Sequence, residues 1–276
     1  MKRFRFAILA ALLACTAQAR TLYVSTTGSH KYGSATDATT NANHGRIVGG
    51  VTSAEDSPFA GESSAAFDGT TGYIGFGNPA SLDMSAQTNI TIEFWIWMNN
   101  TNGFQSVYES GTDYEKTYLS VYTRHLSDTN GFSVGFNWGG NWKSLRFGDA
   151  TATATGKWIH VAAVRSGTNL WAMTNGVEAA WSLGSYAQTP TYANARAGYN
   201  SSLSPGYLNG RLSDLRIWNV ARTPEQIAEN YTNRLTGTEE GLVGYWPLTD
   251  PVINPVDSGP FNLDNPTIHP TYLEAF

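Results

Sequence analysis

The chain has 276 residues, of which 14% are charged and 13% aromatic, with 28 glycines and a formal net charge of -5. Soluble proteins usually carry about 25% charged residues. This balance excludes a disordered tail, a coiled coil and a basic nucleic-acid-binding protein. The abundance of Thr, Val, Ile, aromatic residues, Gly and Asn favours strands and turns over helices.

The first 19 residues have the composition of a secretory signal peptide. Three basic residues precede an apolar run over residues 6–14, and Ala17-Gln18-Ala19 offers a small-x-small cleavage site. We therefore expect a secreted, extracellular protein whose mature form keeps 14 basic and 22 acidic residues. No later stretch reaches 18 uninterrupted apolar residues, so we expect no transmembrane segment.

A second interpretation of this leader stays open. Leu12-Leu13-Ala14-Cys15 approximates the lipobox of bacterial lipoproteins, in which cleavage leaves a lipidated cysteine at the new N-terminus. Cleavage before Cys15 would give a membrane-anchored lipoprotein. Cleavage after Ala19 would leave a mature chain without any cysteine, and hence without a disulfide.

After the leader, the sequence predicts a succession of short strands. Residues 20–60 are polar with short apolar pieces, which indicate N-terminal edge strands and loops. Over residues 61–250, strand signals recur between Gly- and Asn-containing turns, as in an all-β antiparallel two-sheet sandwich. The predicted strands cover residues 65–67, 72–76, 90–98, 117–122, 131–138, 142–147, 158–164, 170–174, 195–199, 210–218 and 241–248.

Only one helix is predicted, a short surface helix near residues 223–232. Thr223 is a suitable N-cap, and Pro224 fits the first helical position. Ile227 and Tyr231 lie one helical turn apart. The chain ends in a Pro-rich extension, residues 251–276, which must be extended or looped.

Period-two alternation divides the two longest strands into faces. Along residues 90–98, one face carries Ile90, Ile92, Phe94 and Ile96, which we expect in the core, and the other carries Glu93, Trp95 and Trp97. Along residues 210–218, the same rule places Leu212, Asp214, Arg216 and Trp218 together, opposite Ser213, Leu215 and Ile217. We predict a Glu93–Arg216 ion pair between neighbouring strands.

Four segments in a fixed order carry a family resemblance: residues 67–74, 90–96, 158–176 and 210–219. They resemble, in turn, the first core hairpin, the central strand, the paired strands ending in an Asn-Gly turn and the last core strand of the laminin G-like jelly roll of the concanavalin A-like lectin/glucanase superfamily. The resemblance spans roughly residues 37–250. It implies two curved antiparallel sheets packed face to face.

The sequence contains no recognisable catalytic array. The glucanase branch of the superfamily uses the spacing E-x-D-x-x-E, in which alternate residues project carboxylates into one cleft. Glu109, Asp113 and Glu115 come nearest, but their spacing differs and the stretch reads as a solvated turn. The segment around Arg196 and Tyr199 is similar to an alginate-lyase strand, but the accompanying motifs are absent. His160 is expected to be a packed, hydrogen-bonded core residue.

Carbohydrate binding requires aromatic faces for the C–H surfaces of sugars, and amides or carboxylates for the hydroxyls. Trp138 and Trp142 flank a Gly-Gly turn with Asn141 beside them, and Trp181 and Tyr199 are weaker candidates in neighbouring segments. An exposed tryptophan at a turn reduces solubility unless it serves a function. Packing of these rings over a sheet edge is the alternative.

The resemblance also suggests a structural calcium ion, because many jelly rolls of this superfamily use one to fasten loops. Residues 37–45 look like the family's D-x-S-G-N-x-N-x-G turn, with Thr40 in place of the usual glycine. The candidate oxygen donors are Asp37, Asn41, Asn43, Asp68 and Asp214. The same residues also suit Asx-turn capping without a metal.

These observations predict a secreted, non-catalytic recognition module, most plausibly for a glycan or a cell-surface glycoconjugate. A divergent polysaccharide-degrading hydrolase or lyase is the first alternative. An adhesion or structural surface protein that binds other proteins is the second. The acidic balance gives no reason to expect a nucleic-acid partner.

Overall fold

Two antiparallel β-sheets make up the described part of the protein. The computed structural model describes residues 34–100, 103–111, 119–126, 131–138, 141–147, 155–183, 192–200 and 206–249. Sheet A has the strand order β1 (Ser34–Ala35), β2 (Gly45–Val48), β5 (Tyr73–Gly77), β14 (Ala195–Ala197), β7 (Phe104–Ser110), β8 (Leu119–Leu126), β9 (Gly131–Trp138) and β10 (Asn141–Phe147).

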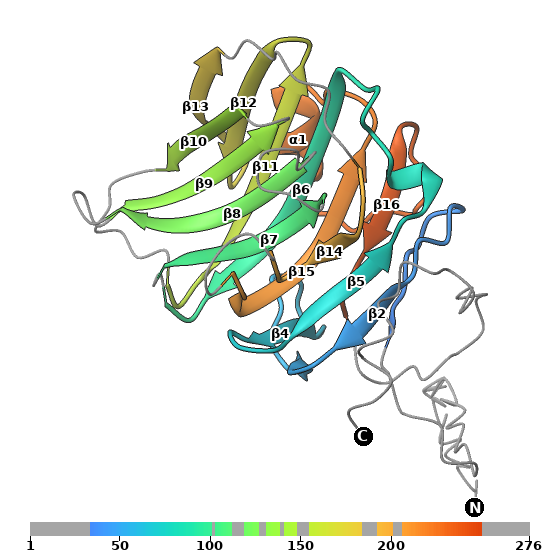
Figure 1. Ribbon diagram of the computed structural model, residues 1–276, viewed down its shortest axis with the longest axis vertical. Coiled ribbons are helices and arrows are strands. Elements are labelled where there is room, and N and C mark those ends of the chain that lie inside the picture. The colour runs from blue at the N-terminus through green and yellow to red at the C-terminus, as the bar shows by residue number, and fades with distance from the viewer. Residues whose placement is uncertain are drawn as a thin grey trace, which may run out of the picture. The chain divides into compact units, whose positions relative to one another are not determined.

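Sheet B has the order β13 (Val177–Leu183), β12 (Asn169–Thr174), β11 (Trp158–Ser166), β6 (Asn89–Met98), β15 (Asn209–Trp218), β4 (Ser64–Asp68) and β3 (Val51–Ala54), and β16 (Leu242–Trp246) also pairs with β15. A 3-10 turn, η1 (Ala80–Leu82), follows β5. Figure 1 shows the two sheets stacked on each other. The expected all-β sandwich is confirmed.

The hydrophobic core lies between the sheets. On β6, Ile90, Ile92, Phe94 and Ile96 are at most 1% exposed. They belong to the same apolar cluster as Ile74 of sheet A. The predicted alternation on β6 is confirmed, and it leaves Glu93 and its neighbours on the outer face of sheet B.

The expected face assignment along β15 is wrong at Leu212 and Ser213. Leu212 lies in the core cluster with Leu215, not on one face with Asp214, and Ser213 pairs with Trp95 on the outer face. The register with β6 shifts between Ser213 and Arg216, and Asp214 has a φ of +59°. A β-bulge inserts one residue and reverses the alternation, and aspartate tolerates the left-handed conformation better than most residues.

The turn over residues 69–72 is not the expected hairpin. It connects β4 of sheet B to β5 of sheet A, so the chain changes sheets here. The turn between β2 and β3 makes the opposite crossing beside it. A Cβ atom on Gly49, whose φ is +64°, would collide with the Thr71 carbonyl, and one on Gly50 with the Asp68 carboxylate. The two crossings pack so closely that only glycine fits.

The predicted helix is present as α1 (Pro224–Asn230). Thr223 is its N-cap and forms a capping box, in which its side chain accepts from the Gln226 N–H and the Gln226 side chain accepts from the Thr223 N–H. Ile227 is fully buried in a cluster with Val164 and Trp171 of sheet B. The helix therefore covers part of the outer face of sheet B.

Candidate functional site

A continuous row of residues crosses the middle of sheet A. The register pairs each member with the next through seven strands, in the order Arg46, Gly75, Arg196, Glu109, Ser120, Asn137 and Trp142. The neighbouring row contains Ile74 and Tyr108, which belong to the core cluster. Because successive residues alternate between the faces of a sheet, the first row, here called the sheet A row, lies on the outer face over its described side chains, from Arg46 to Glu109.

The centre of this row is a carboxylate beside a guanidinium. Glu109 Oε2 lies 3.5 Å from Arg196 Nε, and the Glu109 side chain is fully buried while that of Arg196 is 16% exposed. The expectation of a solvated turn is therefore wrong for Glu109, which sits inside β7. Asp113 and Glu115 lie outside the described residues. The sequence had suggested a turn because of Gly111, which follows the end of the strand.

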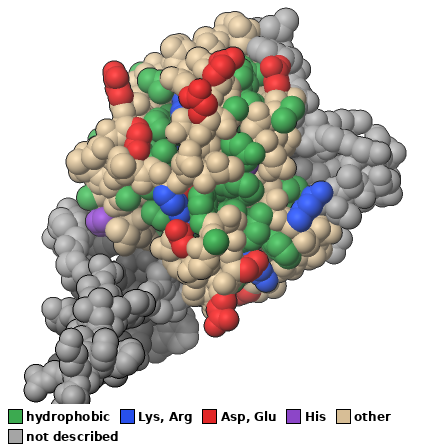
Figure 2. All heavy atoms as spheres, turned by 180° about the vertical axis from the view of Figure 1, so that it is seen from behind, with side chains coloured by type: hydrophobic (Ala, Val, Ile, Leu, Met, Phe, Trp, Pro, Cys, Tyr) green, Lys and Arg blue, Asp and Glu red, His purple; other side chains and the backbone are tan. Residues whose placement is uncertain are grey.

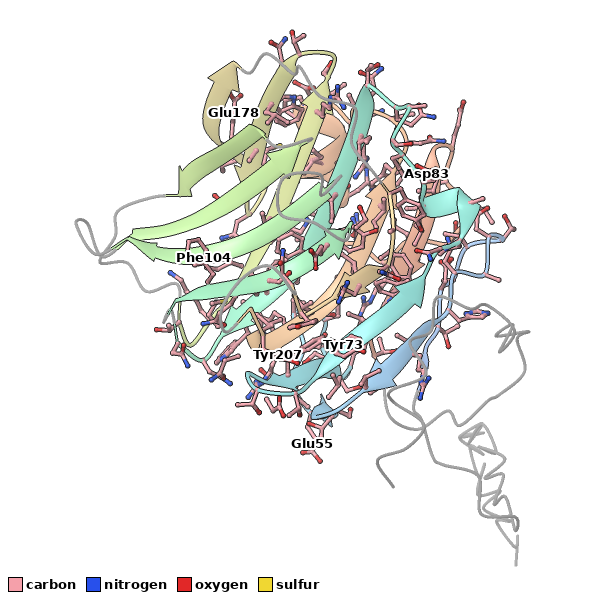
Figure 3. All side chains as sticks on the ribbon, viewed as in Figure 1. Glu55, Tyr73, Asp83, Phe104, Glu178 and Tyr207 are labelled. Carbon is pink, nitrogen blue, oxygen red and sulfur yellow. The ribbon has the colours of Figure 1, made fainter. Side chains whose placement is uncertain are left out.

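Three tyrosines gather next to Arg196. The rings of Tyr199 and Tyr207 are stacked at 4.3 Å between centroids, and Tyr73 lies 5.6 Å from Tyr199. The Arg196 guanidinium carbon is 5.4 Å from the centre of the Tyr199 ring. All three tyrosines are half-buried, and Figure 3 shows Tyr73 and Tyr207 close together. We call them the tyrosine cluster.

Sequence reasoning identified Tyr199 but missed its two partners. Tyr73 was detectable, because it alternates with the buried Ile74 on β5 and must face outward. Tyr207 was not detectable, because its position depends on how the segment that leads into β15 folds back. In that segment the Leu208 N–H donates to the Gly198 carbonyl.

The other predicted ligand-binding residues fall in two places. Trp138 pairs with Asn141 at the β9–β10 hairpin, and Trp142 follows in the sheet A row. Trp181 lies on β13 in sheet B, paired with Trp171. For β8, β9, β10 and residues 179–183, only strand positions are described. Four of the five predicted residues therefore belong to sheet A or its extension, and Trp181 lies on β13 of sheet B, a strand that contacts β10.

The predicted calcium donors in the first loop are occupied by the chain itself. Asp37 Oδ1 accepts from the backbone N–H groups of Thr39 and Tyr245. Asp37 Oδ2 accepts from the Thr39 hydroxyl and the Asn43 N–H. The side-chain amides of Asn41 and Asn43 both donate to the Val243 carbonyl, so this loop is fastened to β16 by hydrogen bonds.

Of the remaining two donors, Asp68 ends β4 and Asp214 lies at the bulge of β15. Asp68 Oδ1 accepts from three backbone N–H groups of the turn at 70–72, and the Thr71 hydroxyl donates to Oδ2. Burial alone would raise the pKa of Asp68, but these hydrogen bonds outweigh it and hold the pKa well below its usual value. Asp214 contacts Arg216 and Arg234. The residues as placed do not fit a calcium cage, and no metal-binding group of three His, Cys, Asp or Glu occurs among the described residues.

A buried charge network lies on the outer face of sheet B, beneath α1 and the loop that follows it. Glu93 Oε1 is 2.5 Å from Arg222 Nη1, while Glu93 Oε2 is 3.5 Å from Arg216 Nη1 and 3.6 Å from His160 Nε2. The predicted Glu93–Arg216 pair is confirmed. Glu93, Arg216 and His160 are fully buried, and Arg216 also contacts Asp214 at 2.5 Å.

Burial and charge act in opposite directions on this network. Burial alone would raise the pKa of Glu93, but His160, Arg216 and Arg222 outweigh it and lower the pKa to about 2. Burial lowers the pKa of His160, so this ring is neutral at pH 7. His160 is buried as expected, and its Nε2, 3.6 Å from Glu93 Oε2, contributes most to lowering the pKa of Glu93. Glu93, Arg216 and His160 are closed off from solvent, so this part of the network offers no access to a substrate.

Comparisons with known proteins place the fold. The model of a laminin G-like family described as Concanavalin A-like lectin/glucanases superfamily matches residues 68–228, more than half of the chain. Domain 4 of AbnA, an extracellular GH43 arabinanase from Geobacillus stearothermophilus, in complex with arabinotriose, is 16% identical with a TM-score of 0.53, covering 72% of this chain and 98% of that one. No curated protein sequence matches the chain.

Toxin domains share the same fold. The receptor-binding domain of botulinum neurotoxin C/D mosaic serotype is 14% identical with a TM-score of 0.53, covering 73% of this chain and 51% of that one. The binding domain of botulinum neurotoxin DC in complex with SialylT is 14% identical with a TM-score of 0.51, covering 68% and 46%. The chain thus matches about half the length of these toxin domains.

Among the described residues, no helix is long and apolar enough to span a membrane, and α1 has only seven residues. The chain belongs to the laminin G-like family of the Concanavalin A-like lectin/glucanases superfamily.

Proposed function

We propose that this protein is a non-catalytic glycan-recognition module that binds its ligand on the outer face of sheet A. The observation that carries the proposal is the Tyr199–Tyr207 stack beside Arg196. Aromatic rings next to a few polar groups are typical of sites that bind small ligands. A sugar ring can place its C–H face on the tyrosines and its hydroxyls near the guanidinium.

The composition of the sheet A row supports recognition over hydrolysis. Glycosidases place two carboxyl groups about 5–5.5 Å or 6.5–9.5 Å apart on either side of the scissile bond. The row contains one carboxylate, Glu109, which is buried against Arg196. The other described side chains of the row are those of Arg46 and Arg196, which suit hydrogen bonding to hydroxyls.

The relatives support the ligand class. Domain 4 of the arabinanase was solved with arabinotriose, and a botulinum toxin binding domain with SialylT.

We also propose that the protein is secreted, because residues 1–19 have the composition of a signal peptide. A lipid anchor at Cys15 is the alternative. Mass spectrometry of the mature N-terminus separates the two, because a free Arg20 excludes lipidation.

A glycan array tests the proposal. We expect the wild type to bind a subset of glycans and Tyr199→Ala to lose at least about tenfold in affinity, or ~1.4 kcal/mol. Tyr199→Phe keeps the ring and should retain binding. Val177→Ala, at a residue 67% exposed on sheet B, is the control for a surface change elsewhere. A wild type that binds no glycan would overturn the proposal. Release of reducing ends from a polysaccharide would favour an enzyme, and specific capture of a protein would favour adhesion.

A further inference from the structure

A second row of aromatic and charged residues crosses the outer face of sheet B. The register aligns Trp158 of β11 with Trp97 of β6, and Trp97 with Arg211 of β15. The row continues through Ala66 of β4 to Thr52 of β3. It therefore starts with two indoles and a guanidinium and ends on two small side chains at the edge of the sheet.

The large residues of this row contact one another and one carboxylate. The Trp97 and Trp158 rings meet edge to face at 6.0 Å between centroids. The Arg211 guanidinium carbon lies 5.1 Å from the centre of the Trp97 ring. Asp56 forms an ion pair with Arg211 and accepts a hydrogen bond of 3.3 Å from the Trp158 indole N–H. We call Trp97, Trp158, Arg211 and Asp56 the tryptophan platform.

The platform is partly exposed. The Asp56 side chain is 45% exposed and that of Arg211 28% exposed, and both indoles are half-buried. In the next row, Trp95 is also half-buried and contacts Phe59 and Tyr231, whereas His160 is fully buried. Seen from behind, hydrophobic side chains gather in the middle of the face with basic and acidic side chains beside them (Figure 2).

We propose that the tryptophan platform is a second saccharide-binding site, separate from the one on sheet A, and that its ligand is a neutral oligosaccharide. The proposal rests on the proposed function for the class of ligand. The indoles offer apolar surface for the C–H face of a sugar ring. Asp56 accepts from hydroxyls and Arg211 donates to them. Because these two charges are paired, the platform has no net charge that would select an ionic ligand.

The small residues beside the platform set the direction of the ligand. Ala66 is half-buried and Thr52 is exposed, so nothing bulky rises from β4 or β3 next to Arg211. A sugar ring over Trp158 and Trp97 can therefore continue as a chain across β15 towards the sheet edge. We expect affinity to increase from a disaccharide to a tetrasaccharide.

Native mass spectrometry with arabinotriose, xylotetraose, cellotetraose and mannotetraose tests this second site. We expect at least one probe to bind Tyr199→Ala, which lacks the first site, and to bind Trp158→Ala at least tenfold more weakly. Trp158→Phe keeps a ring and should retain most of the binding. Arg211→Ala removes a partly exposed side chain and should lower the affinity for the same probe. This variant tests the site even if Trp158→Ala fails to fold.

The outcomes separate this inference from the proposed function. Suppose that every probe binds Trp158→Ala and Arg211→Ala with the affinity of the wild type, and that no probe binds Tyr199→Ala. The second site then does not exist, and the first one does. If no probe and no array glycan binds the wild type, both proposals fall. A loss of thermal stability in Trp158→Ala with unchanged binding would mean that the platform only shields sheet B.

Discussion

The clearest energetic prediction concerns Glu93→Gln. The Glu93 carboxylate is fully buried and has two arginines and His160 within 3.6 Å. Glutamine keeps the shape of the side chain but removes the negative charge. Arg222 then loses its carboxylate partner at 2.5 Å, and Arg216 keeps one carboxylate partner among the described residues, Asp214. Breaking a buried ion pair by removing one partner costs about 3–5 kcal/mol, because the other charge stays buried and uncompensated.

Urea unfolding followed by tryptophan fluorescence measures this loss. Domains of this kind have a free energy of unfolding of about 5–15 kcal/mol, so the change should appear as a large shift of the midpoint. Glu178→Gln, on an exposed strand position of β13, is the matched control, and should change stability by less than about 0.5 kcal/mol. A loss below about 1 kcal/mol in Glu93→Gln would mean that the arginines find other partners, and the reasoning would be refuted.

Two further predictions concern pH and calcium. The pKa of Glu93 is lowered to about 2, so its stabilisation is present above its ordinary pKa and lost as the pH falls from about 5 to 2. Because the pKa of His160 is lowered in the folded protein, the free energy of unfolding should already decrease as the pH falls below about 6.5. His160→Leu should therefore remove the decrease between about pH 6.5 and 5 when stability is measured against pH. An unchanged curve would contradict this. Because the oxygens of Asp37 and Asp68 already accept hydrogen bonds, melting temperatures in calcium and in EDTA should agree, and a difference of several degrees would restore the calcium site.

The parts of the fold that follow period-two alternation were predictable. The β6 pattern predicted both the core face and a carboxylate on the opposite face, and the neighbouring strand predicted its Arg216 partner. The bulge at Asp214 was not predictable, because a left-handed aspartate leaves no mark in the pattern of apolar residues. It moved Leu212 into the core.

The sites were less predictable than the strands, because they form between segments far apart in the chain. Arg222 reaches Glu93 from the loop before α1, and no spacing rule connects residues 129 positions apart. Asp56 likewise reaches Arg211 from a loop 155 positions away. The contact of Trp97 with Trp158 also depends on the register of β6 with β11, which the pattern of either strand alone does not contain.

The positions of the two proposed sites bear on the choice between recognition and adhesion. Packed sheets lie about 10 Å apart, and outer faces point in opposite directions. A single sugar ring therefore cannot contact the tyrosine cluster and the tryptophan platform together, and two glycan chains can occupy the two sites at once. A protein with both sites would bridge two glycan chains, and the bridge would gain strength from the joint action of two weak contacts. Adhesion to a glycan-coated surface and glycan recognition would then be the same activity. A variant that lacks either site should no longer cross-link glycan chains, but it should still bind glycan through the remaining site.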